Sequence, residues 1–196
     1  MNIFKIFLIS ISFISSLSAF TFDKWKSGDS FKKVLYTAQN NDIPIAKDGL
    51  HHGAKHFNWN LLKDKEKYRT FYYYDNIFGE RAKVLLSFTD KSNELYKINI
   101  YWNLAGKGNI TEFKETLFSI LDKKYNKGKK AIETDLAKNI FYKYRVWNHN
   151  KRTVIHARTS SHSLDITYLD KATQQVDLQT KEKKKLNIIV KDAGKF

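Results

Sequence analysis

The densest group of possible metal ligands in the sequence is a run of histidines in its first third. His52 and His56 lie four residues apart, so on a helix their imidazoles would share one face, a spacing that suits zinc or another first-row metal. Gly53 lies between them and disfavours a helix, and the sequence offers neither an H-E-x-x-H pattern nor an identifiable third ligand. We therefore expect surface histidines here, and no cofactor.

Basic and aromatic side chains alternate with apolar ones along several other segments. In an extended strand every second side chain points to the same face, so a sheet built from these segments is predicted to have one cationic, aromatic face. Such a face would suit an anionic or glycan-like ligand through charge and ring stacking. The alternative is a solvated face on which long side chains only cover apolar surface. The predicted binding face comprises Lys83, Lys97, Tyr101, Lys143, Arg145, Trp147, His156 and Arg158.

The segment 140–147 allows two assignments of its side chains to the two faces. The first points Phe141, Lys143, Arg145 and Trp147 away from the covering helix, and the second points Tyr142, Tyr144 and Val146 away from it. We expect the first, because it exposes the two cations to solvent.

Catalytic motifs are missing from the sequence. It contains no G-x-S-x-G, S-x-x-K or G-x-x-x-x-G-K-[ST] pattern, and without cysteine it has no thiol nucleophile and no thiolate metal site. A basic secreted hydrolase, ribonuclease-like or acting on the cell wall, remains the alternative to a binding protein. Its acid and base would come from Glu80, Glu94, His149 or His156, provided that they converge within hydrogen-bond reach.

The periodicity of apolar residues predicts which elements position these side chains. A helix is expected from Phe31, where apolar residues recur at helical spacing after several candidate capping residues in Ser27-Gly28-Asp29-Ser30, and a second from Thr111 to Tyr125. Strands are expected over 68–74, 82–88, 96–102, 140–147, 153–158 and 164–169. This order predicts an α+β fold: an antiparallel sheet of five to six strands with an N-terminal helix, a helix between strands 3 and 4, and a C-terminal helix or tail.

The N-terminus has the pattern of a secretory signal peptide. One positive charge, at Lys5, precedes the apolar run Ile6–Ile14, and small residues follow as far as Ala19. Cleavage is expected after Ser18 or Ala19, and a retained anchor is the alternative. We expect residues 1–19 to be the signal, so that the mature chain has no transmembrane span and is periplasmic or secreted.

Charge and length indicate the partners and the domain organisation of the mature chain. The formal net charge is +15 with 35 Lys and Arg, but no helix-turn-helix, zinc-finger or aromatic RNP motif accompanies it, so nucleic acid is not the expected partner. The expected partner is instead an anionic component of the envelope or an envelope protein. We expect one α+β domain over residues 20–169 and a basic helix or tail over 170–196.

One hydrophobic pattern resembles that of a known group of proteins. Phe78-Gly79-x-x-Ala82-x-Val84-x-Leu86-x-Phe88, then Leu95-Tyr96-x-Ile98-x-Ile100, then Leu121-x-x-Lys124-Tyr125 is similar to small bacterial periplasmic α+β proteins, the modules like the β-lactamase-inhibitor protein. The likeness covers residues 78–168 and implies a fold, without site residues. Together these observations predict a non-enzymatic binding or interaction module.

Overall fold

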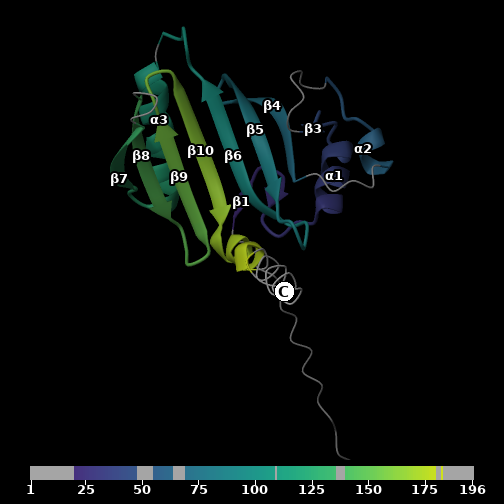
Figure 1. The fold of residues 1–196 in the computed structure, drawn as a ribbon. Helices are drawn as coiled ribbons and strands as arrows, with labels where there is room; N and C mark the ends of the chain where they lie inside the picture. Colours follow the sequence, from purple (N-terminus) through teal and green to yellow (C-terminus); the bar gives the residue numbers. More distant parts are fainter. Residues whose placement is uncertain are drawn as a thin grey trace, which may run out of the picture.

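The computed structural model describes residues 20–47, 55–63, 69–108, 110–135, 140–179 and 182. The expected signal peptide, residues 1–19, and the candidate metal ligand His52 lie outside these residues. Within them the chain forms one large antiparallel sheet with helices at both of its ends (Figure 1).

The main sheet has eight strands in the order β3-β4-β5-β6-β10-β9-β8-β7, with every neighbouring pair antiparallel. The strands are β3 (Ala46–Lys47), β4 (Thr70–Ile77), β5 (Glu80–Phe88), β6 (Leu95–Asn103), β7 (Lys129–Asp135), β8 (Ile140–Asn148), β9 (Thr153–Thr159) and β10 (Ser163–Asp170). A separate pair consists of β1 (Thr21–Phe22) and β2 (Trp25–Lys26). The α+β class and the antiparallel sheet are confirmed, whereas the expected five to six strands are too few, because the two edge strands β3 and β7 were not predicted.

Strands β4, β5 and β6 form the predicted meander. Ile77 pairs with Glu80 across a turn of two residues, Phe78 and Gly79, which both have positive φ, at 56° and 78°. Positive φ at both central positions defines the turn that matches the twist of antiparallel strands. The second half of the sheet returns as β10, which pairs directly with β6 at the centre.

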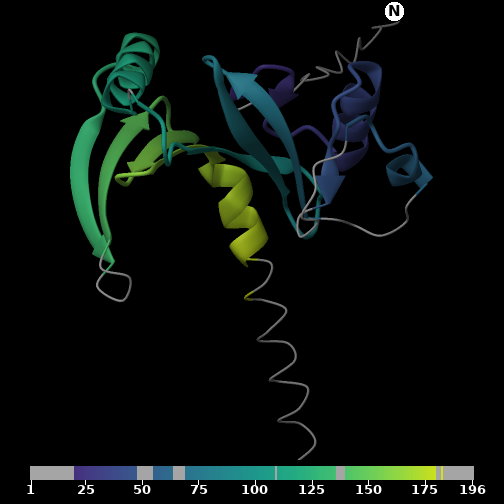
Figure 2. The ribbon, with the colours of Figure 1, turned by 90° about the horizontal axis from the view of Figure 1, so that it is seen from above.

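Two helices cover the same face of the sheet at opposite ends, as Figure 2 shows. The first, α1 (Phe31–Asn40), begins at Ser30, whose hydroxyl accepts a hydrogen bond from Lys33 N at 3.2 Å, and its Phe31 ring packs on Phe71. The second, α3 (Ile110–Tyr125), lies over the other end of the sheet. A short helix, α2 (Asn60–Lys63), follows α1 in the chain. Among the described residues, no helix is both long enough and apolar enough to span a membrane.

The core lies between the sheet and these two helices. The rows of side chains that cross β5, β6, β10 and β9 on this face are apolar, for example Val84, Ile100, Ile166 and Ala157, which are at most 2% exposed. Aligned apolar rows of this kind supply the hydrophobic free energy that holds both helices on the sheet.

The chain leaves the sheet at the end of β10 and continues as a helix over residues 171–179. Asp170 caps this helix, because its carboxylate accepts hydrogen bonds from the backbone N and the hydroxyl of Thr173, and it also pairs with Arg152. Asp177, further along, accepts a hydrogen bond from Asp90 N at 2.7 Å. The beginning of the expected C-terminal helix is therefore bound to the domain at two points.

Candidate functional site

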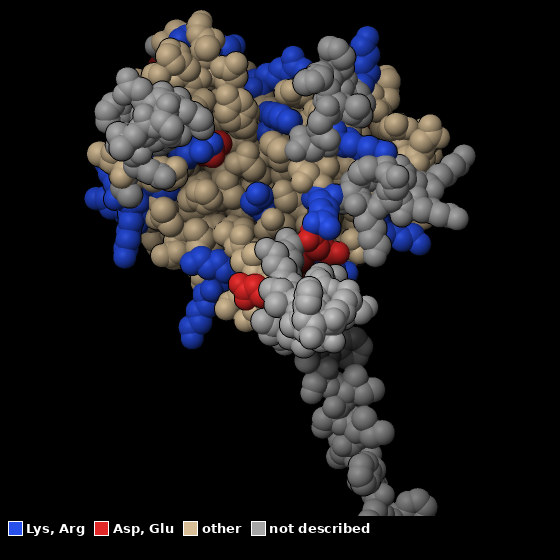
Figure 3. Space-filling model, in the orientation of Figure 1, with Lys and Arg blue, Asp and Glu red and all other residues tan. Residues whose placement is uncertain are grey.

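The face of the sheet opposite α1 and α3, here named the open face, receives five of the eight predicted binding residues. They are Lys83, Lys97, Tyr101, His156 and Arg158, which the strand register places on the same side as one another. Figure 3 views the molecule from this side and shows many Lys and Arg side chains and few Asp and Glu side chains. The open face is therefore predominantly cationic over its described part.

A row of aromatic and cationic side chains crosses the open face. Lys83 lies between Tyr74 on β4 and Tyr101 on β6 in the strand register, and both of these tyrosines are 37% exposed. The Lys83 amine lies 4.3 Å from the ring centre of Tyr72, and the Arg81 guanidinium lies 4.4 Å from that of Tyr74. The row therefore has one accessible ring on each side of Lys83, and the Lys83 amine itself contacts a third ring, that of Tyr72.

The same row continues into β10 and β9, where polar side chains hold one another in place by hydrogen bonds. Arg158 Nε donates a hydrogen bond to the Asp165 carboxylate at 2.9 Å, and Asp165 is only 6% exposed. In the next row, Asn99 Nδ2 donates to the hydroxyl of Thr167 at 2.8 Å. These bonds join strands β6, β10 and β9, and they hold the polar groups in place before any ligand arrives.

His156 lies beside these polar side chains and is, among the described residues, the one half-buried histidine on the open face. Its strand neighbours are Thr167 and Val146. Burial lowers its pKa below the ordinary value of 6.5; the carboxylate of Asp165 opposes this, and the positive charges of Arg158 and Lys97 add to it. The imidazole is therefore predominantly neutral at pH 7.

The structure separates the candidate acid and base groups. Glu80 forms an ion pair with Lys107 at 3.0 Å, Glu94 accepts a hydrogen bond from Ser92, and His149 packs against the ring of Tyr125. None of these three contacts includes His156. The described residues therefore do not bring the four candidates together as an acid–base pair.

The remaining three predicted residues correct the expected register of β8. Arg145 pairs with Ala157 and Trp147 pairs with Ile155, both core residues, so Lys143, Arg145 and Trp147 lie on the face that α3 covers. Trp147 is 1% exposed. The expectation was wrong because it gave more weight to exposing two cations than to burying a tryptophan, and a period of two puts all three on one side. Lys97 and Arg145 therefore lie on opposite faces of the sheet.

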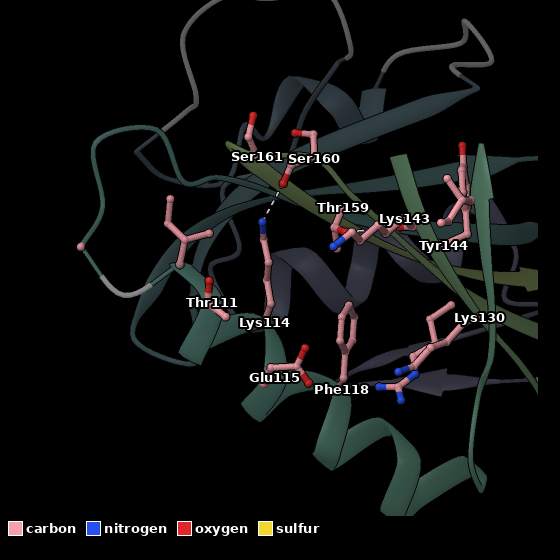
Figure 4. Close-up of a pocket in the computed structure, with 14 residues that line it drawn as sticks. Thr111, Lys114, Glu115, Phe118, Lys130, Lys143, Tyr144, Thr159, Ser160 and Ser161 are labelled. Carbon is pink, nitrogen blue, oxygen red and sulfur yellow. Dashed lines mark hydrogen bonds between the residues drawn. The ribbon is translucent and has the colours of Figure 1, made fainter. Parts of the chain in front are cut away.

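This register creates a cavity, here named the α3 pocket, between the N-terminal half of α3 and the outer strands. The rows that are apolar in the core become cationic on β8 and β7, where Lys130 pairs with Arg145 and Ile132 pairs with Lys143. Flexible charged side chains do not fill space as an apolar core does, and a cavity of about 990 Å³ remains. Its lining includes Lys114, Phe118, Lys130, Ile132, Lys143 and Arg145, several of which Figure 4 labels.

The amines of Lys114 and Lys143 extend into the same space in Figure 4. Lys114 Nζ donates a hydrogen bond to the backbone carbonyl of Ser160 at 2.7 Å. Burial lowers the pKa of Lys114 below its ordinary value, and the charge of Lys143 lowers it further. The α3 pocket is thus a place where positive charges meet at a cost in free energy.

Asp122 anchors α3 to β8 beside this pocket. Its Oδ1 accepts hydrogen bonds from Trp147 Nε1 at 2.7 Å and from Gly128 N at 3.0 Å, and its Oδ2 lies 3.2 Å from the Arg145 guanidinium. Burial acts to raise the pKa of Asp122, but the two hydrogen bonds and the charges of Arg145 and Lys127 lower it below the ordinary value. The sequence indicates this arrangement by one feature. Lys143, Arg145 and Trp147 are spaced two residues apart, so that all three lie on the same face of the strand.

The candidate metal ligand His56 has another role in the structure. Its Nδ1 lies 3.2 Å from the carboxylate of Asp42 in an exposed pair, and this pair lowers the pKa of Asp42. Within the part of the chain that the structure describes, no three His, Cys, Asp or Glu side chains are placed to hold a metal ion.

Comparison with protein-family models, with curated proteins and with solved structures finds no match for this chain. Inference about its function therefore rests on the geometry and charge of the two faces.

Proposed function

We propose that this protein is a non-enzymatic binding module of the bacterial envelope that takes an anionic glycan on its open face. The observation that carries the proposal is the row in which Lys83 lies between the exposed rings of Tyr74 and Tyr101. Rings stack on the apolar faces of sugars, and the cation between them pairs with an acidic substituent.

The surrounding charge supports the same ligand class. Lys97 and Arg158 lie on the same face, and the chain as a whole has a formal net charge of +15. A surplus of one sign attracts a polyanion from beyond contact distance, and salt screens this attraction within about 10 Å at 0.1 M. Binding through the open face is therefore expected to weaken as the ionic strength rises.

The proposal requires the face to be rigid as well as charged. The bonds Arg158 to Asp165 and Asn99 to Thr167 connect three neighbouring strands beneath the exposed rings. A ligand that stacks on this face then orders few side chains on binding, which reduces the entropic cost of association.

Titration calorimetry with polygalacturonate as the acidic probe and dextran as the neutral one tests the proposal. We expect polygalacturonate to bind and dextran not to bind, and we expect Lys83→Gln to weaken binding about tenfold, which corresponds to one lost charge-assisted hydrogen bond. Lys123→Gln is the matched control, because Lys123 is exposed in the last turn of α3, away from the open face.

Two outcomes would overturn the proposal. Equal weakening by Lys83→Gln and Lys123→Gln would mean that net charge, rather than the open face, determines binding. Release of soluble sugar from peptidoglycan that His156→Ala abolishes would replace the binding module by a hydrolase.

A further inference from the structure

The α3 pocket carries a second inference, independent of the open face because it lies on the other side of the sheet. Its volume of about 990 Å³ is at the upper end of the range usual for small-molecule sites. It is bounded by α3, β7, β8 and the turn after β9.

Positive charge exceeds negative charge in the lining of the pocket. Four cations, Lys114, Lys130, Lys143 and Arg145, face one carboxylate, that of Glu115. Among the described residues the three lysines form no ion pair, and Arg145 pairs only with Asp122. A concentration of positive charge next to a covering helix favours the binding of an anion.

One polar atom of Arg145 also lacks a partner among the described residues. Its side chain is 11% exposed, and its guanidinium lies 5.2 Å from the ring centre of Phe118. The Nε atom is buried and has no hydrogen-bond partner among the described residues. An unpaired buried donor carries a cost in free energy, although the other side of the guanidinium is paired with Asp122.

The other side of the pocket is apolar. Ile132, on the edge strand β7, is 75% exposed and pairs with Lys143 across the strands. Phe118 and Ile110 extend the apolar surface along α3. A molecule that fills the pocket would place an anionic group against the lysines and an apolar part against these residues.

From this arrangement we infer that the α3 pocket binds a phosphomonoester that bears an apolar chain. Lysine acts as a point charge toward phosphate, which accepts hydrogen bonds in several directions and carries close to two negative charges at neutral pH. Three amines that have no ion pair among the described residues match such a dianion better than they match a single carboxylate. The same chemistry occurs in a free amphiphile and in a lipid headgroup, and the experiment must separate the two.

Titration calorimetry of the purified protein with three probes tests the inference. The probes are inorganic phosphate, monomeric dodecyl phosphate, and vesicles of phosphatidylcholine with one fifth phosphatidate. We expect dodecyl phosphate to bind at least about tenfold more tightly than inorganic phosphate, the gain from burying about two methylene groups. Binding to the vesicles as well as to the monomer would identify a lipid headgroup as the source, whereas binding to the monomer alone would identify a free amphiphile.

Variants locate the binding. Lys143→Gln is expected to weaken dodecyl phosphate about tenfold, as the loss of one charge-assisted hydrogen bond does, and the exposed Lys123→Gln is expected to leave the affinity within twofold. Ile132→Ser changes an exposed side chain and is expected to remove most of the advantage of dodecyl phosphate over inorganic phosphate. Far-UV circular dichroism establishes that each variant is folded.

Three results would overturn the inference. They are the absence of binding by dodecyl phosphate, equal affinity for inorganic phosphate and dodecyl phosphate, and equal weakening by Lys143→Gln and Lys123→Gln. None of them bears on glycan binding by the open face, which the Lys83→Gln variant tests separately.

Discussion

Replacement of Asp122 by asparagine tests how α3 is fixed to the sheet. The carboxylate accepts hydrogen bonds from Trp147 Nε1 and Gly128 N and pairs with the Arg145 guanidinium. The asparagine amide has nearly the same shape and can still accept both hydrogen bonds. It carries no charge, so the variant removes the ion pair and weakens the two bonds without making a cavity.

The magnitude follows from the exposure of these groups. Removing one partner of a fully buried pair costs about 3–5 kcal/mol, whereas exposed pairs contribute about 0–1 kcal/mol. Here Arg145 is 11% exposed and Asp122 is 26% exposed, so we expect a loss of about 1–2 kcal/mol, intermediate between these limits. For a chain of this size that loss lowers Tm by about 5 °C.

The effect should also depend on pH. The pKa of Asp122 in the folded protein is below its ordinary value of 3.8, so its contribution to stability is present above that value and is lost as the pH falls through the folded-state pKa. The difference between wild type and Asp122→Asn is therefore expected to be complete at pH 7 and to shrink below about pH 4.

Urea denaturation followed by tryptophan fluorescence measures this difference. Asp23→Asn is the control, because among the described residues Asp23 pairs only with its exposed neighbour Lys24, and it should change the free energy of unfolding by less than about 0.5 kcal/mol. In the background of Arg145→Met the cost of Asp122→Asn should fall by about half or more. The reasoning is refuted if Asp122→Asn is as neutral as the control, or if its cost is unchanged without Arg145.

Three further perturbations address other parts of the structure. Gly128→Ala should destabilise by about 2 kcal/mol, because an added Cβ would lie 2.7 Å from the Trp147 ring, whereas Gly108→Ala, with nothing within 4 Å, should be neutral in the same urea titration; equal effects would contradict the packing. Ser30→Ala should cost about 1 kcal/mol in thermal unfolding by loss of the α1 cap, and an unchanged Tm would refute that role. His156→Gln should reduce the decline in stability from pH 7 to 5, because the lowered pKa makes the unfolded state bind more protons below pH 6.5; an identical pH profile would exclude His156 as the cause.

The local elements of the fold could be predicted where the periodicity of apolar residues agrees with the capping and turn residues that bound each element. The α1 helix follows from the candidate capping residues at 27–30 and the apolar residues after Phe31. The meander of β4 to β6 follows from the aromatic composition of the first strand, the alternation in the next two and the turn that contains Gly79. The edge strand β7, Lys129–Asp135, could not be recognised in the same way. Charged residues are common on edge strands, where they prevent pairing with other chains, and they mask the strand pattern.

The distribution of charge between the two faces could be predicted only in part. Lys83, Tyr101 and Arg158 follow from alternation within strands whose apolar side is unambiguous. On β8 the alternating set that includes Trp147 also includes Arg145. Burying the ring would turn this set toward the core, whereas exposing the cation would turn it toward solvent. The contact that decides between them, Trp147 to Asp122 on α3, joins residues 25 positions apart in the chain and has no local signature.

The most direct test of the proposed function is an amide-resolved NMR titration of the protein with polygalacturonate oligomers. We expect the largest shift changes at Lys83 and Tyr101, on the open face, and small changes at Lys143, on the side covered by α3. Shift changes concentrated at Lys143, or spread evenly over both faces, would contradict the assignment of glycan binding to the open face.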